Sequence, residues 1–366
     1  MINGQHVDRP VRTRRLPRPS RPDPGPDAET AAPDAAGAAA TLLAHHGAGE
    51  PLEVSPVAEG LLNRGYRVTA TTGRYFLKCY VDPATATPGA IAAQHRATAA
   101  LHALGLPTAP PLAAPGGRTF HTVAGRRYAL FPWVEGGHRA GHELDRDQCA
   151  ALGSLLGAVH LALAGIHPPV RQPAEQPTAD PARTEELIEE LLARTARRPR
   201  DGMDELARQR LLERRALLGA YAHRRPRPGD APPTGWVHGD FHPLNLLYRG
   251  AEPAAILDWD RLGLRPRAEE AVRGATLFFH HPRTGALDLG RVRRFSRAYR
   301  ETGAADAGQM AAAVHRVWWE RLNDFWMLEW RYLRGDRRTD PLFPAAAAQI
   351  VRWCEEYEQV LDAYTN

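Results

Sequence analysis

The sequence predicts an α+β fold with two lobes: a small antiparallel sheet with one inserted helix, and a larger, mainly helical part that follows it. Short apolar segments separated by turn residues recur between residues 52 and 131, a pattern typical of antiparallel strands. From about residue 143 the spacing of apolar residues becomes that of long helices. We expect two such lobes to pack with a cleft between them.

The first lobe is expected to occupy residues 35–132, after an extension of residues 1–34 that is rich in Arg and Pro. Gly73 lies in a predicted hairpin turn, and Gly105 with Pro107 would end the inserted helix. The expected elements are a helix at 36–47, strands at 52–58, 66–71 and 75–81, a helix at 88–104, and strands at 119–123 and 127–131.

The second lobe would occupy residues 133–366, and the composition changes at the segment 131–136. A short strand-like stretch at 236–260 interrupts its helical pattern. The expected helices span 145–166, 182–198, 203–222, 287–302, 306–334 and 344–364.

Composition excludes several classes of protein. Hydrophobic residues make up 43% and charged residues 24% of the 366 residues, as in an ordinary globular protein. No run of about 18 apolar residues is evident, so no membrane partner is expected. The cysteines Cys79, Cys149 and Cys354 are far apart and form no CxxC pattern. This argues against a disulfide framework or a zinc site and favours a reducing cytoplasm.

The excess positive charge is concentrated at the start of the chain. Six arginines against one aspartate in the first 21 residues give a surplus that equals the net charge of +5 of the whole chain. The extension has no apolar core, so we expect it to be disordered and to lack a targeting signal. Charge runs of this kind are usually just solvated, and no nucleic-acid partner is expected.

Only one of the 47 cationic Lys and Arg residues is a lysine, Lys78. A compositional bias toward arginine could leave one stray lysine. Alternatively, the position needs a compact ammonium rather than a planar fork, as a phosphate ligand does.

The segment 236–260 carries the strongest chemical pattern. Asp240 and Asn245 lie five residues apart on a predicted loop, and Asp258 follows an apolar strand. Magnesium prefers hard oxygen ligands and commonly takes one or two protein carboxylates, with water and phosphate completing its shell. These three side chains could therefore surround a phosphate-bound magnesium ion.

The segment His238-Gly239-Asp240 with Asn245, followed by Asp258, resembles the HGDxxxxN catalytic loop and metal-binding Asp of the aminoglycoside phosphotransferase family, relatives of the protein kinases. The resemblance covers most of residues 52–335. It implies a protein-kinase-like fold, ATP and Mg²⁺ as cofactors, and transfer of the γ-phosphoryl group to a hydroxyl of a small molecule.

The resemblance also implies individual roles. Asp240 would orient the acceptor hydroxyl and accept its proton, and Asn245 and Asp258 would hold magnesium. Lys78 would pair with the α- and β-phosphates. The remaining nucleotide contacts would come from a turn over the phosphates and from the backbone that joins the lobes: Gly60, Asn63, Gly65, Phe131 and Trp133.

Several neighbouring residues keep more than one interpretation. His238 and His242 are expected to support the loop. Asp260 either adds to the metal site or is a solvated residue after the strand. Glu269 and Glu270 lie where the family has an acid that braces the catalytic loop, without a fixed register, and otherwise are helix-start charges.

One position departs from the family pattern. The family pairs its phosphate lysine with a glutamate on the inserted helix, and the aligned residue here is Gln94. Either another acid, such as Glu59, substitutes for it, or Lys78 is held more loosely. The second case favours a catalytically weak nucleotide-binding module over an enzyme. A protein kinase is disfavoured, because no DFG or APE segment is present.

The acceptor would bind in the helical lobe, where aromatic and acidic residues gather. Such aromatics at helical spacing more often form packed core than a binding surface. The acids could bind a cationic acceptor or pair with Arg316, Arg321 and Arg331. The acceptor stays open between an antibiotic hydroxyl, as of an aminoglycoside, and a metabolite such as homoserine, choline or a sugar. The residues concerned are Trp318, Trp319, Glu320, Asn323, Asp324, Phe325, Trp326, Glu329, Trp330 and Tyr332.

Overall fold

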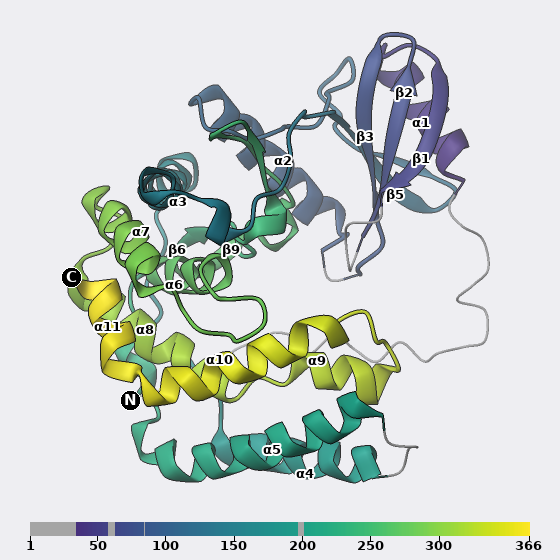
Figure 1. Ribbon diagram of the computed structural model, residues 1–366. Coiled ribbons are helices and arrows are strands. Elements are labelled where there is room, and N and C mark those ends of the chain that lie inside the picture. The colour runs from purple at the N-terminus through teal and green to yellow at the C-terminus, as the bar shows by residue number, and fades with distance from the viewer. Residues whose placement is uncertain (1–33, 58–62, 84, 197–200) are drawn as a thin grey trace, which may run out of the picture.

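A computed structural model describes residues 34–57, 63–83, 85–196 and 201–366. Helix α1 (Ala35–His46) leads into a five-stranded antiparallel sheet with the order β1-β2-β3-β5-β4, and helix α2 (Pro88–Ala103) is inserted between β3 and β4 (Figure 1). The strands are β1 (Pro51–Val57), β2 (Arg64–Ala70), β3 (Gly73–Tyr80), β4 (His121–Val123) and β5 (Arg126–Pro132). The predicted α+β architecture is confirmed.

Local sequence explains the elements of this lobe. The β2–β3 hairpin closes with Ala70 opposite Gly73, whose φ of 151° favours glycine. Thr87 caps α2 through its side chain, and Pro88 occupies the first turn, where a missing N–H costs nothing. One face of the sheet packs against α1, where Leu77 and Leu42 are among the fully buried residues.

The second lobe contains most of the helices and two two-stranded sheets. The pairs are β6 with β9 and β7 with β8. The helices are α3 (Arg146–Ile166), α4 (Pro181–Ala196), α5 (Gly202–Tyr221), α6 (Arg267–Phe278), α7 (Leu289–Glu301), α8 (Ala307–Leu322), α9 (Trp326–Glu329), α10 (Phe343–Glu355) and α11 (Tyr357–Thr365). The strands are β6 (Thr234–Val237), β7 (Leu246–Arg249), β8 (Glu252–Ile256) and β9 (Gly263–Pro266).

The structure corrects two predicted helices and adds one. Helix α6 was not predicted. The helix expected at 306–334 ends at Leu322 and resumes as α9 and a π-helix, Trp330–Arg334, because the Asp324 side chain accepts the amide of Trp326 and starts a new turn. The helix expected at 344–364 is divided at Glu356 into α10 and α11.

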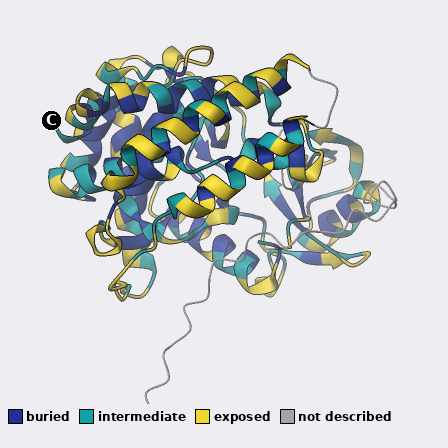
Figure 2. Ribbon diagram, turned by 90° about the horizontal axis from the view of Figure 1, so that it is seen from below, coloured by how far each residue is buried: buried dark blue, intermediate teal, exposed yellow. Residues whose placement is uncertain are grey.

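The helical lobe has one large core with helices that are buried on one side and exposed on the other (Figure 2). Trp318, Trp319 and Trp353 are almost completely buried there. Helix α3 is long and apolar enough, by length and composition alone, to cross a membrane. It packs against α7, and Leu152 and Leu156 lie in the core, so its apolar character serves the interior of this lobe.

Candidate active site

The predicted catalytic loop connects β6 to β7 and is held by His238. The His238 side chain is completely buried, its Nε2 lies 2.8 Å from the carbonyl oxygen of Leu257, and its Nδ1 accepts the amide of Asp240 at 3.1 Å. Burial lowers the pKa of His238, so the ring is neutral at pH 7 and these contacts assign the proton to Nε2. His238 therefore fixes the backbone of Asp240 relative to the segment that leads to Asp258.

Glu270 of α6 supports the same loop through its backbone amides. Its buried carboxylate accepts the backbone amides of His238, at 3.0 Å, and of Gly239, and it lies 2.8 Å from Nε2 of His160. Burial opposes the charge on Glu270, but the hydrogen bond from His160 and these amides lower its pKa, so it is ionised. The bracing acid is thus Glu270. Glu269 instead forms ion pairs with other side chains of the helical lobe.

Gly239 is required by the shape of this loop. Its φ is +89°, and a Cβ atom at this position would lie 2.1 Å from the carbonyl oxygen of Arg261. Both facts exclude a larger side chain without movement of the backbone.

Asn245 links the two predicted acidic positions. Its side-chain Nδ2 donates to the main-chain carbonyl oxygen of Asp240 at 2.8 Å. Its main-chain carbonyl oxygen accepts the amide of Leu257, also at 2.8 Å. Leu246 and Ile256 are directly paired in the β7–β8 hairpin, which brings the residues flanking them together. Asp240, Asn245 and Asp258 are thereby assembled through backbone contacts, one of which uses the side-chain nitrogen of Asn245.

Lys78 reaches across from the sheet of the first lobe to the second. It lies on β3, paired with Gly65 of β2 and Ala129 of β5. Its Nζ is 2.7 Å from an Oδ1 of both Asp258 and Asp260. Burial acts to lower the pKa of Lys78, but the two carboxylates outweigh it and raise the pKa, so the ammonium is charged.

The two aspartates differ in environment. The Asp258 side chain is 46% exposed, whereas that of Asp260 is 9% exposed. Burial acts to raise the pKa of Asp258, but Lys78 lowers it to about 2. For Asp260, burial and the nearby charge of Asp258 outweigh Lys78 and raise the pKa to about 6. Asp258 also has a left-handed backbone, with φ 54°, which is rare for a residue other than glycine and is found at functional sites.

Gln94 does not replace the family's glutamate as a partner of Lys78. Its Nε2 donates instead to the main-chain oxygen of Asp260 at 3.2 Å. The acidic partners of Lys78 come from the second lobe. This resolves the alternative of a loosely held lysine: another acid, Asp260, substitutes, and Glu59 lies outside the described residues.

Asn63 also contacts Asp260, and its contact with the nucleotide phosphates stays a prediction. Its Nδ2 donates to the Asp260 carboxylate, and its Oδ1 accepts the amide of Val81 at 2.7 Å. A Cβ at Gly65 would lie 2.6 Å from the ring of Phe76, so this glycine permits close packing. Gly60 lies outside the described residues.

Two residues were predicted to lie beside adenine: Phe131, near the end of β5, and Trp133, directly after it. Phe131 is paired with Phe76, with ring centroids 6.3 Å apart. The amide of Trp133 donates to the carbonyl oxygen of Arg74 at 3.1 Å. Both lie on the path from the sheet to the second lobe, and their contact with adenine stays a prediction.

The Asp240 carboxylate lies near a histidine and an arginine. Its Oδ2 is 3.8 Å from Nε2 of His242 and 3.7 Å from Nε of Arg261. Burial acts to raise the pKa of Asp240, but His242 and Arg261 lower it, so it is ionised. Such a carboxylate is well placed to orient a hydroxyl. Arg261 was missed in the sequence, although it follows Asp260 directly.

Several of the predicted acceptor residues belong to the core, and one forms an ion pair. Trp318, Trp319, Phe325 and Tyr332 are buried. Arg316 pairs with Glu269 at 2.6 Å. Glu320 is an exposed residue of α8 that binds Arg273 of α6, whereas Asp324 follows α8 and is half-buried.

The donor set fits a hard divalent cation. Asn245, Asp258 and Asp260 offer amide and carboxylate oxygens, the ligands that such ions take. Among the described residues, no cluster of three or more His, Cys, Asp or Glu side chains could hold a metal by itself. A metal here would therefore depend on phosphate oxygens and water as further ligands.

A model of the phosphotransferase enzyme family matches residues 53–304. This chain belongs to that family. Two relatives are homoserine kinases. That of Methylobacillus flagellatus is 25% identical over 330 residues, which cover 87% of this chain and 93% of the relative. That of Methylobacillus glycogenes is 26% identical over 296 residues, which cover 75% and 81%.

Solved structures of the same fold include three kinases. Spectinomycin phosphotransferase APH(9)-Ia in complex with ADP and spectinomycin has a TM-score of 0.57 at 14% identity and covers 89% of this chain and 96% of its own. The microcompartment-associated aminopropanol kinase has 0.55 at 19%, covering 90% and 98%. Amicoumacin kinase hAmiN in complex with AMP-PNP, Ca²⁺ and Ami has 0.53 at 18%, covering 86% and 89%.

The predicted protein-kinase-like fold and family are confirmed. The chain is a small-molecule kinase of this family, which transfers a phosphoryl group.

Proposed function

We propose that this phosphotransferase moves the γ-phosphoryl group of ATP, with Mg²⁺, to the hydroxyl of a small amino acid of the homoserine type. The observation that carries the transfer chemistry is the convergence of Lys78 on Asp258 and Asp260, next to a loop that ties Asp240 to Asn245. Because ATP is the phosphoryl donor, we expect the protein to act in the cytoplasm.

Each residue has a distinct task in this proposal. Lys78 neutralises the α- and β-phosphates as a point charge, and Asn245 and Asp258 hold Mg²⁺, which offsets charge on the β- and γ-phosphates when bound. Asp240 orients the acceptor hydroxyl toward the γ-phosphorus and accepts its proton. Positioning and charge neutralisation supply most of the rate in such transfers.

Arg261 supports an acceptor that carries a carboxylate. Its guanidinium lies 3.7 Å from Asp240, and its side chain is 47% exposed. A carboxylate a few bonds from the reacting hydroxyl could form a bidentate pair with it. Homoserine has such a carboxylate, whereas aminopropanol and choline lack one. The two homoserine kinases, matched over most of their length, support the same choice.

The test is a mass-shift screen with Mg-ATP and a panel of homoserine, choline, aminopropanol, a sugar, spectinomycin and an aminoglycoside. We expect transfer to homoserine. Transfer only to an antibiotic would overturn the acceptor assignment and give the protein a role in resistance. Magnesium-dependent ATP binding without transfer to any compound would favour the catalytically weak module instead.

Arg261→Ala separates acceptor binding from chemistry. We expect KM for homoserine to rise about tenfold, while the weaker transfer to aminopropanol changes little. Arg265→Ala is the matched control, because Arg265 lies four residues further on in β9. Equal effects of Arg261→Ala on both acceptors would contradict a carboxylate contact.

A further inference from the structure

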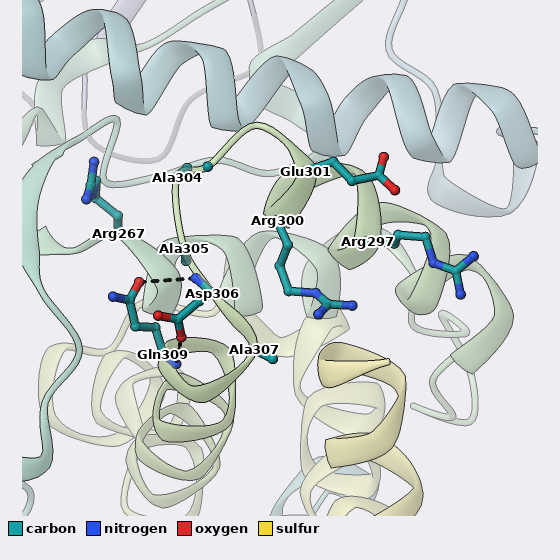
Figure 3. A pocket seen from close by; sticks show the side chains of 10 residues that line it. Arg267, Arg297, Arg300, Glu301, Ala304, Ala305, Asp306, Ala307 and Gln309 are labelled. Carbon is teal, nitrogen blue, oxygen red and sulfur yellow. Dashed lines mark hydrogen bonds between the residues drawn. The ribbon is translucent and has the colours of Figure 1, made fainter.

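A pocket lined by arginines lies outside the phosphotransferase site. It has a volume of about 700 Å³ and is formed by the start of α6, the end of α7 and the turn that leads into α8 (Figure 3). We call it the arginine pocket. Its lining residues are Arg267, Arg297, Arg300, Glu301, Gly303, Ala304, Ala305, Asp306, Ala307 and Gln309. This volume is within the range of pockets that bind small organic molecules.

Two of the three guanidinium groups contact the carboxylate of the last residue, Asn366, which offsets part of their charge. Within the described ranges, none of Arg267, Arg297 and Arg300 forms an ion pair with an Asp or Glu side chain. The Nε atoms of Arg267 and Arg300 are buried, and no described residue accepts a hydrogen bond from either. Nη2 of Arg300 and of Arg297 donate to the main-chain oxygen of Asn366, at 3.0 and 3.4 Å. Unused buried donors of this kind are suited to an anion.

The acids of the pocket do not cancel this preference. Oδ1 of Asp306 accepts the amide of Gln309 at 2.8 Å and caps α8. Glu301 lines the pocket beside Arg300, and in Figure 3 its carboxylate points away from the Arg267 side. Both acids reduce the net positive charge, so a ligand with hydroxyl or amino groups beside its anionic group fits better than a bare ion.

We propose that the arginine pocket binds a phosphate ester of a small organic molecule, and that its occupation acts on the catalytic loop. Guanidinium groups form bidentate hydrogen bonds with phosphate oxygens. In Figure 3 Arg300 and Arg297 lie on one side of the pocket and Arg267 on the other, so different parts of the ester would meet them. The organic part of the ester would lie in the part of the pocket that is lined by residues 303–307.

A chain of buried hydrogen bonds leads to the catalytic loop from Tyr299, the residue before Arg300 on α7. Tyr299, next to Arg300, has its hydroxyl 2.9 Å from Nδ1 of His160. Nε2 of His160 lies 2.8 Å from Glu270, and Glu270 accepts the amide of His238 at 3.0 Å. These groups are buried, so a change at one end is not absorbed by solvent.

Arg267 provides a second connection. It lies one turn before Glu270 on α6, so a shift of the first turn moves both. Its side-chain stem also covers Gly235 of β6, where a Cβ would come 2.8 Å from Cδ of Arg267. Strand β6 runs directly into His238. A ligand that binds more tightly to one position of the first turn of α6 than to another would shift this turn, and the loop would move with it.

Binding is tested by calorimetric titration with glycerol 3-phosphate, with glycerol as the neutral control. We expect binding to the parent protein that weakens at least tenfold in Arg267→Ala and Arg300→Gln, each verified as folded by its thermal melt. Arg294→Ala, an exposed residue of α7 outside the pocket, and Lys78→Ala should bind as the parent does. No binding, equal binding by all variants, or a loss confined to Lys78→Ala would overturn the site.

Coupling is tested by hydrogen exchange of residues 236–245 with and without saturating glycerol 3-phosphate. We expect the exchange of this loop to change in the parent protein. Tyr299→Phe, which removes the hydroxyl that faces His160, should bind the ester and lose that change. An unchanged loop in the saturated parent, or the same change in Tyr299→Phe, would contradict the coupling.

Discussion

The ammonium of Lys78 lies 2.7 Å from the carboxylate of Asp260, a residue 182 positions further along the chain. This contact joins the sheet of the first lobe to the catalytic segment of the second. Gln94 and Asn63 both bind Asp260, so the aspartate is the centre of the arrangement.

Replacing Lys78 by arginine should impair nucleotide binding even though the charge is kept. A planar fork cannot occupy the position of a compact ammonium between two carboxylates. We expect KM for ATP to rise at least tenfold in steady-state assays of Lys78→Arg. Arg74→Lys is the control, since Arg74 lies on the same strand and pairs with the exposed Glu135 at 2.5 Å. Normal ATP kinetics in Lys78→Arg would show that the shape of the cation is unimportant.

Gly239→Ala should lower both stability and activity. The new Cβ would meet the Arg261 carbonyl at a position with φ +89°, so the loop that carries Asp240 must move. We expect a loss of about 1–3 kcal/mol in the free energy of unfolding. Gly219→Ala in α5, where a Cβ meets nothing within 4 Å, should instead gain about 0.5–1 kcal/mol. Urea unfolding measures both, and similar changes in the two variants would contradict the steric explanation.

Glu270→Gln and Glu269→Gln should differ although the residues are adjacent. Glu270 accepts two loop amides, whereas Glu269 pairs with Arg316 and Arg273. We expect Glu270→Gln to reduce kcat at least tenfold with little change in nucleotide affinity, because a single amide oxygen holds the loop less firmly. Glu269→Gln should mainly lower the melting temperature. If kcat falls equally in both, the loop is not braced by Glu270 alone.

Acid should destabilise the protein partly through Asp204. Burial acts to raise the pKa of this carboxyl, but Tyr332 and Arg331 lower it below its ordinary value of 3.8. The folded protein therefore binds this proton less tightly than the unfolded chain does. The contribution of Asp204 is present above about pH 4 and is lost as the pH falls through the lowered pKa.

The Asp204→Asn variant tests this directly. Arg331 is 1% exposed and would lose one buried partner, so we expect a loss of about 3–5 kcal/mol near neutral pH. The difference from the parent in urea unfolding should shrink between pH 5 and pH 3. A difference that is independent of pH would show that Asp204 is not ionised in the folded protein.

The sequence was sufficient for the sheet and for the catalytic motif, because both depend on local patterns. The strands alternate over short turns, and Asp240, Asn245 and Asp258 keep a fixed spacing. Helix α6 was missed because Glu269 and Glu270, which look like surface charges, are buried by partners far away in sequence.

The partners of Lys78 could not be predicted for the same physical reason. Asp260 becomes the bound acid only when the two lobes meet, and no local spacing records that contact. The break after Leu322 depends on a side-chain cap by Asp324 that competes with helix continuation. Arg331 likewise pairs with Asp201, Asp204 and Asp340 rather than with acids on its own helix.

The most direct measurement is single-turnover transfer from Mg-ATP to homoserine by Asp240→Asn, with nucleotide binding measured in parallel. Asp240 is the carboxylate placed to orient the hydroxyl, so the transfer rate should fall by about 10²–10⁴-fold. Nucleotide affinity should stay within about twofold, and Asp147→Asn, an exposed change on α3, should behave as the parent does. A variant of Asp240 that transfers phosphate as fast as the parent would contradict the assignment of this site.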